Sequence, residues 1–329
     1  MPGETRAPVA CIGAGRMGRG IGHAFAYAGH QVRLIDAKSR SIAEFETLAS
    51  QVMEEVRGSL TMLARLGLFD EALVGKIAAR VSVHPKSAGR EALAGVPFVF
   101  EGVPETEPAK REALAFADEA ADPAAIVAST TSTFLSTALA GFTRRPQRFL
   151  NAHWLNPAYL VPLVEVSPHP GTDPAVTAAL TGLLEGIGKV PVVCKASPGY
   201  IVPRIQALAM NEAARLAEEG VASAEDIDKA VLYGFGFRFA VLGLLEFIDW
   251  GGGDILFYAS RYMASATGDD RFRAPKVVED NMAQGRIGLK SGAGFYDWSS
   301  RDVNAYREQR LGSFLKMLKH LDMTRPPAE

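Results

Sequence analysis

In the first 200 residues, short apolar runs alternate with longer amphipathic stretches, which predicts strands separated by helices. Seven apolar runs have the length and bounding residues of buried strands: Val9–Gly13, Gln31–Asp36, Pro97–Phe100, Ile126–Ala128, Phe149–Ala152, Leu163–Val166 and Val190–Cys194. Between them, apolar residues recur every three or four positions, as in helices, over Ile21–Ala28, Ser41–Ala79, Glu107–Ala121 and Pro174–Gly186. Alternating strands and helices predict a Rossmann-like α/β domain.

Two parts of the chain depart from this alternation. The stretch Ser41–Ala79 is unusually long and is broken near Gly67 and Asp70, so a pair of helices is expected there as an excursion from the α/β domain. Beyond Pro198 the pattern is mostly helical, over Ile201–Glu219, Ser223–Tyr233, Leu242–Tyr262 and Pro275–Gln284. Because single cores stop growing near about 250–300 residues, we predict two domains, residues 1–196 and an all-α domain of residues 197–329.

Composition and charge exclude several classes of function. The chain is 48% hydrophobic and 22% charged, with a net charge of −2 and no basic stripe, so nucleic acid is not an expected partner. No window approaches the roughly 18 apolar residues of a membrane span, and Met1 to Pro8 has no secretory apolar core. A cytoplasmic protein is therefore expected. Cys11 and Cys194 lie in apolar runs, and no histidines have metal-ligand spacing, so no metal is expected.

A glycine-rich fingerprint lies between the first predicted strand and helix. The segment GAGRMG fits G-x-G-x-x-G, in which Gly13 permits a tight turn, Gly15 admits a pyrophosphate and Gly18 allows the helix to pack on the strand. The helix N-terminus that follows, with Arg16 and Met17, would receive the negative charge. The fingerprint predicts a dinucleotide site.

An acidic residue closes the next predicted strand. Asp36 would accept hydrogen bonds from the adenine ribose hydroxyls and repel a 2′-phosphate, which favours NAD over NADP. Lys38 and Arg40 follow closely and could soften that preference.

The segment AHWLNPAYLVPLVEV sets an imidazole, His153, twelve residues before a carboxylate, Glu165. One histidine in an apolar segment is usually a core residue. Here the hydroxyl-rich run Ser129–Thr133 also follows a predicted strand, and ligands of open α/β sheets bind beyond the carboxyl ends of strands. Oxidising a secondary alcohol requires a base for its proton, and a histidine backed by a carboxylate suits that task. With the fingerprint, the pattern predicts a nicotinamide-dependent alcohol dehydrogenase.

Six segments in chain order resemble the L-3-hydroxyacyl-CoA dehydrogenase family, which also includes L-gulonate 3-dehydrogenase (lambda-crystallin). They are GAGRMG, EGVPETEPAK, ASTTS, HWLNP followed by LVEV, SPGYIVPR and KSGAGFYDW. The resemblance implies that His153 is the base, that Glu165 orients it, and that Ser132 hydrogen-bonds the substrate oxygen. Three further positions match residues that line the cofactor or shape the substrate pocket: Glu105, Lys110 and Asn156.

The chain departs from the family pattern near the expected substrate. Pro203 stands where the family usually carries an asparagine that helps to hold the substrate, and proline has neither donor nor side-chain acceptor. Trp154, Tyr200 and Arg204 are candidates for reshaping the pocket, although ordinary packing explains the two aromatic residues equally well.

Two substrate classes and a non-catalytic role stay open. A 3-hydroxyacyl-CoA such as 3-hydroxybutyryl-CoA, and with it fatty acid metabolism, is the first expectation. The helical excursion offers a CoA phosphate few basic partners, however, so a free 3-hydroxy acid of the gulonate or carnitine type is the alternative. Pro203 also leaves room for a structural NAD-binding protein of the crystallin kind, although Ser132, His153 and Glu165 argue against it.

A homodimer is expected mainly from the resemblance. The predicted helix Leu242–Tyr262 is long and apolar, with Phe235, Phe237 and Phe239 just before it, which suits a subunit interface. An intramolecular core gives the same pattern.

Overall fold

The computed structural model describes residues 6–328 and divides into two compact units, which meet between Ala209 and Met210. Residues 1–5, most of the stretch without a secretory core, lie outside the described range. The division falls inside helix α8 (Val202–Glu218). The boundary expected after residue 196 stays a prediction.

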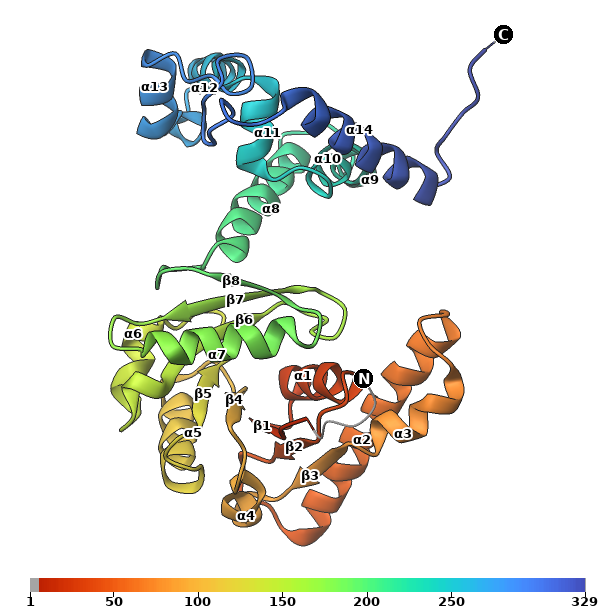
Figure 1. Cartoon of the computed structure of the whole chain (residues 1–329), viewed down its shortest axis with the longest axis vertical. Helices are drawn as coiled ribbons and strands as arrows, with labels where there is room; N and C mark the ends of the chain where they lie inside the picture. The colour runs from red at the N-terminus through yellow and green to blue at the C-terminus, as the bar shows by residue number, and fades with distance from the viewer. Residues whose placement is uncertain (1–5, 329) are drawn as a thin grey trace. The chain divides into compact units, whose positions relative to one another are not determined.

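The first unit is built on one eight-stranded sheet (Figure 1). The order is β3-β2-β1-β4-β5-β6-β7-β8, and all neighbours are parallel except the antiparallel pair β6 and β7. The strands are β1 (Val9–Ile12), β2 (Val32–Ile35), β3 (Val81–His84), β4 (Phe98–Glu101), β5 (Ile126–Ser129), β6 (Phe149–Trp154), β7 (Leu163–Pro168) and β8 (Val190–Val193). The predicted Rossmann-like fold is confirmed.

Helices cover both faces of the sheet. In β1, Val9 and Cys11 face one hydrophobic core while Ala10 and Ile12 face the other, because successive strand residues point to opposite sides. The helices are α1 (Arg16–Tyr27), α2 (Ile42–Arg65), α3 (Val74–Ala78), α4 (Gly89–Leu93), α5 (Glu107–Ala120), α6 (Ser136–Leu139) and α7 (Pro174–Glu185). Helices α1, α2 and α7 contribute to the first core, and α4 and α5 to the second.

The excursion expected from the sequence is the helix pair α2 and α3, which pack on each other (Figure 1). Helix α2 begins with a capping box, in which Ser41 and Glu44 satisfy each other's backbone N–H groups. It ends before Gly67, whose φ of 86° suits glycine. The edge strand β3, which follows, was not predicted, because a run of two valines separated by serine carries little strand signal.

A buried histidine ties α1 to α2. The ring of His23 is 2% exposed, bonds through Nδ1 to Ser59 Oγ at 2.7 Å, and stacks on Tyr159 at 4.3 Å. Burial lowers the pKa of His23 to about 4, helped by the charge of Lys189. His23 therefore has a structural role in this fold.

This histidine should make the first unit acid-sensitive. Its neutral form is favoured in the fold, so its contribution is complete above the unfolded pKa of 6.5 and is lost as the pH falls toward 4. Replacing His23 with Asn keeps a donor toward Ser59 but removes the titration. We expect the loss of unfolding free energy between neutral pH and about pH 4.5 to shrink by roughly 2–3 kcal/mol. Urea unfolding of both proteins at the two pH values measures this difference, and equal losses would contradict the assignment.

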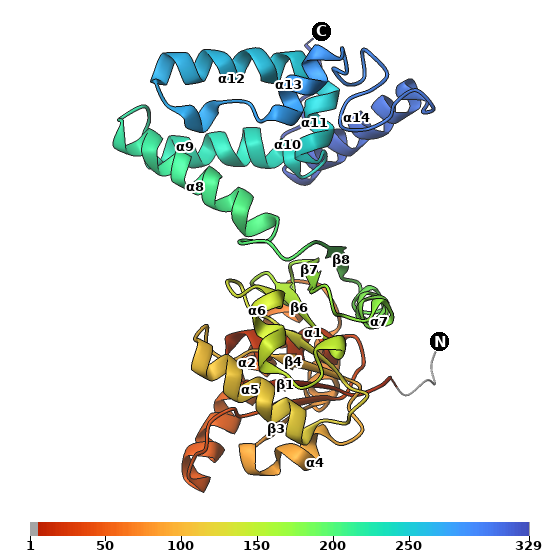
Figure 2. The same cartoon turned by 90° about the vertical axis from the view of Figure 1, so that its left-hand side faces the viewer.

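The second unit is helical. Its helices after α8 are α9 (Ala224–Ala230), α10 (Phe237–Phe239), α11 (Leu244–Gly251), α12 (Gly253–Thr267), α13 (Lys276–Ala283) and α14 (Val303–His320). A π-helical segment, Val231–Gly236, joins α9 to α10 so that the three run on as one helix (Figure 2). Across residues 6–328, no single helix is long and apolar enough to cross a membrane; only Ala224–Phe239 and Leu244–Gly251 pass that test together, across an 86° bend.

The single helix expected over Leu242–Tyr262 is wrong. Gly252 breaks it with a φ of 113°, and α11 ends just before it. The apolar face continues on α12, where Ile255, Tyr258 and Tyr262 are exposed. The homodimer stays a prediction.

The KSGAGFYDW segment of the second unit packs around one buried carboxylate, that of Asp249. Asp249 of α11 accepts hydrogen bonds from the N–H groups of Phe295 and Tyr296 and from the indole of Trp298, each at 2.9 Å. A Cβ added at Gly294 would overlap the Asp249 carboxylate, so only glycine fits that close approach. The segment therefore has a structural task here.

Candidate active site

The glycine-rich loop between β1 and α1 is shaped for a dinucleotide. A Cβ at Gly13 would come within 2.6 Å of the Gly102 carbonyl, and one at Gly18 would collide with the Gly13 carbonyl. At Gly15, by contrast, the space is open, which leaves room for a pyrophosphate to approach the backbone. Helix α1 begins at Arg16 with no side-chain cap and no acid in its first turn, so its N-terminal N–H groups suit an anion.

A cavity of about 240 Å³ adjoins this loop and contains Asp36 among its lining residues. The Asp36 carboxylate accepts hydrogen bonds from Arg40 Nε at 2.6 Å and from the Lys38 N–H at 3.1 Å. An adenine ribose would therefore share Asp36 with Arg40, which with Lys38 is expected to soften cofactor selectivity.

Neutralising Asp36 should shift cofactor use toward NADP. The variant Asp36→Asn removes the negative charge and leaves Arg40 free to meet a 2′-phosphate, so the NADP/NAD ratio of kcat/KM should rise by about tenfold or more. Steady-state kinetics with both cofactors measure the ratio. The double variant Asp36→Asn/Arg40→Ala is the control, and its NADP/NAD ratio should rise less. An unchanged ratio in the single variant would show that Asp36 does not contact the adenine ribose.

Two predicted residues meet at a second cavity. Arg16, the exposed first residue of α1, and Asn156, from the loop after β6, both line a space of about 240 Å³ between α1, α2 and that loop. Met17, the next residue of the fingerprint, packs against the first core instead. The sequence assigned Arg16 to the cofactor and did not predict its meeting with Asn156.

His153 and Glu165 face each other on the antiparallel strands β6 and β7. They are register partners, which explains their separation along the chain, and His153 Nδ1 lies 2.9 Å from Glu165 Oε2. Glu165 is fully buried, and its Oε1 accepts the N–H groups of Ile201 and Val202 at 2.9 and 2.8 Å. The carboxylate only accepts, so it holds Nδ1 as the protonated nitrogen and leaves Nε2 as the proton acceptor.

Ser132 lies after β5 and is held by Glu105. Its N–H and hydroxyl bond to Glu105 Oε1 at 2.6 and 3.1 Å, and Thr131 Oγ1 bonds to Oε2 at 2.7 Å. Burial alone would raise the pKa of Glu105, but the Ser132 N–H, the charge of Lys110 and the two hydroxyls together hold it below its usual value. Glu105 is thus an ionised support for the serine loop.

Lys110 was expected to line the cofactor site, but the structure buries it. Its side chain is 1% exposed, and its ammonium contacts Glu101 Oε1 at 3.0 Å and Glu105 Oε2 at 3.7 Å. A buried ammonium needs such partners because desolvation of an unpaired charge is costly. Lys110 therefore affects the site indirectly, because its charge helps to keep Glu105 ionised.

Trp154 also lies away from the expected pocket. It follows His153 on β6 and so points to the opposite face, where it packs against Phe25 and Phe100 at 6.0 and 5.9 Å between ring centroids. It is 1% exposed, so the packing explanation holds for this residue. Pro203 is the second residue of α8, where a missing N–H costs nothing, and it offers no hydrogen bond.

Sequence reasoning gave no role to Thr131 or Asn151 and only a reshaping role to Tyr200. The Tyr200 hydroxyl donates to the Thr131 carbonyl at 2.9 Å and accepts from Asn151 Nδ2 at 3.0 Å. Its ring stacks on His153 with centroids 4.8 Å apart. The one signal in the sequence was Asn151, a second polar residue, besides His153, inside an otherwise apolar strand.

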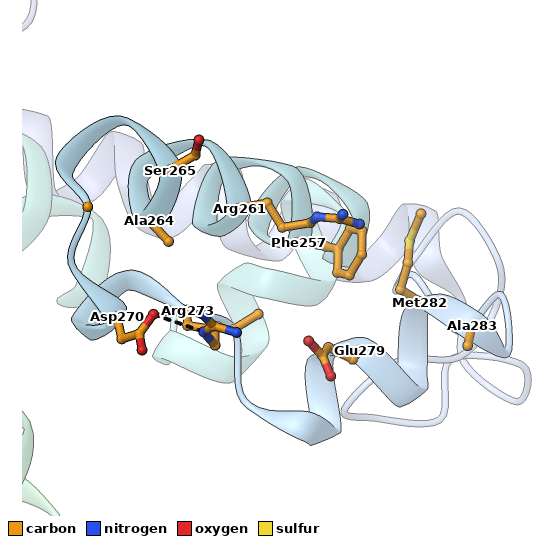
Figure 3. A pocket seen from close by; sticks show the side chains of 11 residues that line it. Phe257, Arg261, Ala264, Ser265, Asp270, Arg273, Glu279, Met282 and Ala283 are labelled. Carbon is orange, nitrogen blue, oxygen red and sulfur yellow. Dashed lines mark hydrogen bonds and ion pairs between the residues drawn. The ribbon is translucent and has the colours of Figure 1, made fainter.

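The second unit holds a larger cavity, of about 880 Å³, between α12 and α13 (Figure 3). Phe257 and Arg261 of α12 line it opposite Glu279 of α13, and the Asp270–Arg273 ion pair lies at its edge. No predicted site residue lines this cavity. Within the described part of the chain, no group of His, Cys, Asp or Glu is placed to hold a metal ion.

Comparisons with known proteins agree over both units. Residues 8–197 match the model of the 3-hydroxyacyl-CoA dehydrogenase NAD-binding domain, and residues 199–298 match the C-terminal domain of the same family. The chain is 30% identical to 5-formyl-3-hydroxy-2-methylpyridine 4-carboxylate 5-dehydrogenase of Mesorhizobium japonicum, over 95% of this chain and 98% of that protein. It is 32% identical to lambda-crystallin of Oryctolagus cuniculus, over 80% of each. The structure of a 3-hydroxyacyl-CoA dehydrogenase from Archaeoglobus fulgidus is similar, with 30% identity, a TM-score of 0.76, and coverage of 97% of this chain and 100% of that one.

Proposed function

The chain belongs to the 3-hydroxyacyl-CoA dehydrogenase family, NAD-dependent dehydrogenases of CH–OH groups, and we propose that it interconverts an L-3-hydroxyacyl substrate with its 3-keto form. The observation that carries the proposal is the buried pair of His153 and Glu165, with Nε2 of the imidazole left to accept a proton. A purely structural protein would not need this pair.

The residues supply proton transfer and orientation. NAD, when bound, supplies the hydride acceptor for the oxidation. His153 Nε2 takes the proton of the substrate hydroxyl, and Glu165 stabilises the resulting imidazolium while the backbone N–H groups of Ile201 and Val202, at the start of α8, keep the carboxylate in place. Ser132 hydrogen-bonds the substrate oxygen; for this its hydroxyl turns away from Glu105, to which it donates in the structure.

We take an acyl-CoA thioester, such as 3-hydroxybutyryl-CoA, as the first substrate class. The match of both family domains and the similarity to the Archaeoglobus 3-hydroxyacyl-CoA dehydrogenase over nearly the whole chain support it.

A free 3-hydroxy acid, of the gulonate or carnitine type, is the second candidate. Pro203 removes a side-chain contact to the substrate, and the cavity beside Asn156 presents the cation of Arg16 within a small space. A relative of almost equal length is named for a pyridine carboxylate, which carries a free acid group. The cation beside the small cavity and the named relative favour a compact anionic substrate.

A substrate panel tests the proposal. Change in NADH absorbance would be followed with acetoacetyl-CoA for reduction, and with L-3-hydroxybutyrate, L-gulonate and L-carnitine plus NAD for oxidation. We expect turnover with the thioester; turnover only with a free acid would establish the second candidate. No turnover of any of these substrates, with NADH binding intact, would contradict both substrate classes.

A further inference from the structure

The proposed reaction brings His153 and Ser132 to the substrate oxygen, and Tyr200 contacts the ring of the first and the peptide group that precedes the second. We propose that it is a positioning residue, which holds the imidazole of His153 and the peptide of Ser132 in one fixed relation. This inference rests on the proposed function for its catalytic meaning, but its geometry can be tested without a substrate.

The first contact fixes the plane of the imidazole. The Tyr200 and His153 rings are 4.8 Å apart between centroids and only 9° from parallel. Glu165 contacts the imidazole at its edge, through Nδ1, and does not contact the face of the ring. The stacked phenol ring restricts tilting of the imidazole about Cβ–Cγ, and its face also stabilises the imidazolium formed when the substrate proton is taken.

The second contact fixes the serine. The Tyr200 hydroxyl donates to the Thr131 carbonyl, and the N–H of the same peptide group, that of Ser132, donates to Glu105. The peptide that carries Ser132 is thus clamped at both ends. Burial raises the pKa of Tyr200, so its hydroxyl stays protonated and remains a donor.

The backbone at Tyr200 supports a constrained role. Its φ is 47°, and among residues 6–328 the only other non-glycine residue with positive φ is Asp322. Such a conformation costs on the order of 1 kcal/mol and persists where surrounding contacts impose it. Here the turn at Gly199 and Tyr200 presents the N–H groups of Ile201 and Val202 to Glu165, so the turn that orients the phenol also anchors the carboxylate behind His153.

Charged and titratable groups around this cluster come from three elements. Glu165 on β7 contacts His153 directly, Glu105 lies beyond the Thr131–Ser132 peptide, and Cys194 lies just after β8 near Glu165. None of these side chains is replaced in a Tyr200 variant. Because the same turn anchors Glu165, the pH profile of Tyr200→Phe, which keeps the ring, is the reference for any shift in Tyr200→Leu.

Two variants separate the hydroxyl from the ring. Tyr200→Phe keeps the stacked ring and frees the Ser132 peptide, so kcat should fall roughly ten- to a hundredfold while the KM for NAD and the pH profile stay unchanged. Tyr200→Leu removes both, so kcat should fall further and the acidic limb of the oxidation profile should move to lower pH, because the imidazolium loses its stacking partner. Tyr27→Phe, in which the altered ring packs on Phe69 at the far end of α1, is the control.

Nitrogen NMR of labelled histidines gives the independent readout, with the His153 signals assigned by their loss in His153→Asn. We expect a wild-type signal protonated at Nδ1 and a titration displaced to lower pH in Tyr200→Leu. Lower melting temperatures with unchanged kcat, pH profile and NMR titration would overturn the proposal and leave Tyr200 a packing residue. A displaced titration in a protein that turns over none of the substrates would instead uphold the geometry and reject the proposed function. Should both variants fail to fold, Asn151→Ala, which removes a donor to the hydroxyl, must lower kcat, and an unchanged kcat would overturn the proposal.

Discussion

Replacing His153 with Asn should lower kcat by about two to four orders of magnitude while NADH affinity stays within roughly twofold of wild type. The asparagine amide can donate to Glu165 Oε2 from nearly the position of Nδ1, so the buried carboxylate keeps a partner. What is lost is Nε2, the only imidazole nitrogen free to accept the substrate proton. The change therefore removes the base with little cost to the fold.

Turnover in both directions and a fluorescence titration with NADH measure the two quantities separately. Glu165→Gln is the informative companion, because it keeps an oxygen but removes the charge that stabilises imidazolium; we expect a smaller loss than for His153→Asn. Turnover within tenfold of wild type in His153→Asn, with any of the substrates in the panel, would show that another group takes the proton.

The parts of the site that the sequence revealed are those tied to strand ends and local motifs. GAGRMG and Asp36 lie at the ends of β1 and β2, where the glycines leave a visible spacing. His153 and Glu165 were recognisable because each sits in an apolar run, and their meeting follows from the antiparallel pairing of β6 with β7. Periodicity and resemblance together were enough for these features.

The features that could not be predicted from the sequence depend on side-chain burial and on contacts between residues far apart in the chain. Residue type could not show that the ammonium of Lys110 is buried beneath Glu105, or that Trp154 points away from His153. Helix α14 was not predicted because its apolar residues do not gather on one face, and the break at Gly252 was hidden inside a continuous apolar stretch. Tyr200 reaches Thr131 across 69 positions, which no local pattern encodes.

Lys110→Met should produce the largest loss of stability in the first unit. Glu101 is fully buried; its Oε1 accepts the Val103 N–H at 2.8 Å and the Lys110 ammonium at 3.0 Å, and its Oε2 accepts the Ser129 hydroxyl at 2.6 Å. Methionine fills a similar volume but leaves the carboxylate without a counter-charge. Breaking one side of a buried ion pair costs about 3–5 kcal/mol, so the free energy of unfolding should fall by that amount.

A double variant separates charge from packing in this prediction. In Glu101→Gln/Lys110→Met this pair no longer buries a charge. The amide oxygen can accept the Val103 N–H and the amide NH2 can donate to the Ser129 oxygen, so we expect most of the lost stability to return. Urea unfolding of the wild type, the two single variants and the double variant measures the coupling. If Lys110→Met alone costs less than about 1 kcal/mol, the ion pair is not what supports this part of the sheet. Folded Lys110→Met should also show a raised pKa of Glu105, because the cation 3.7 Å away helps to lower it, and with it a weaker hold on Ser132.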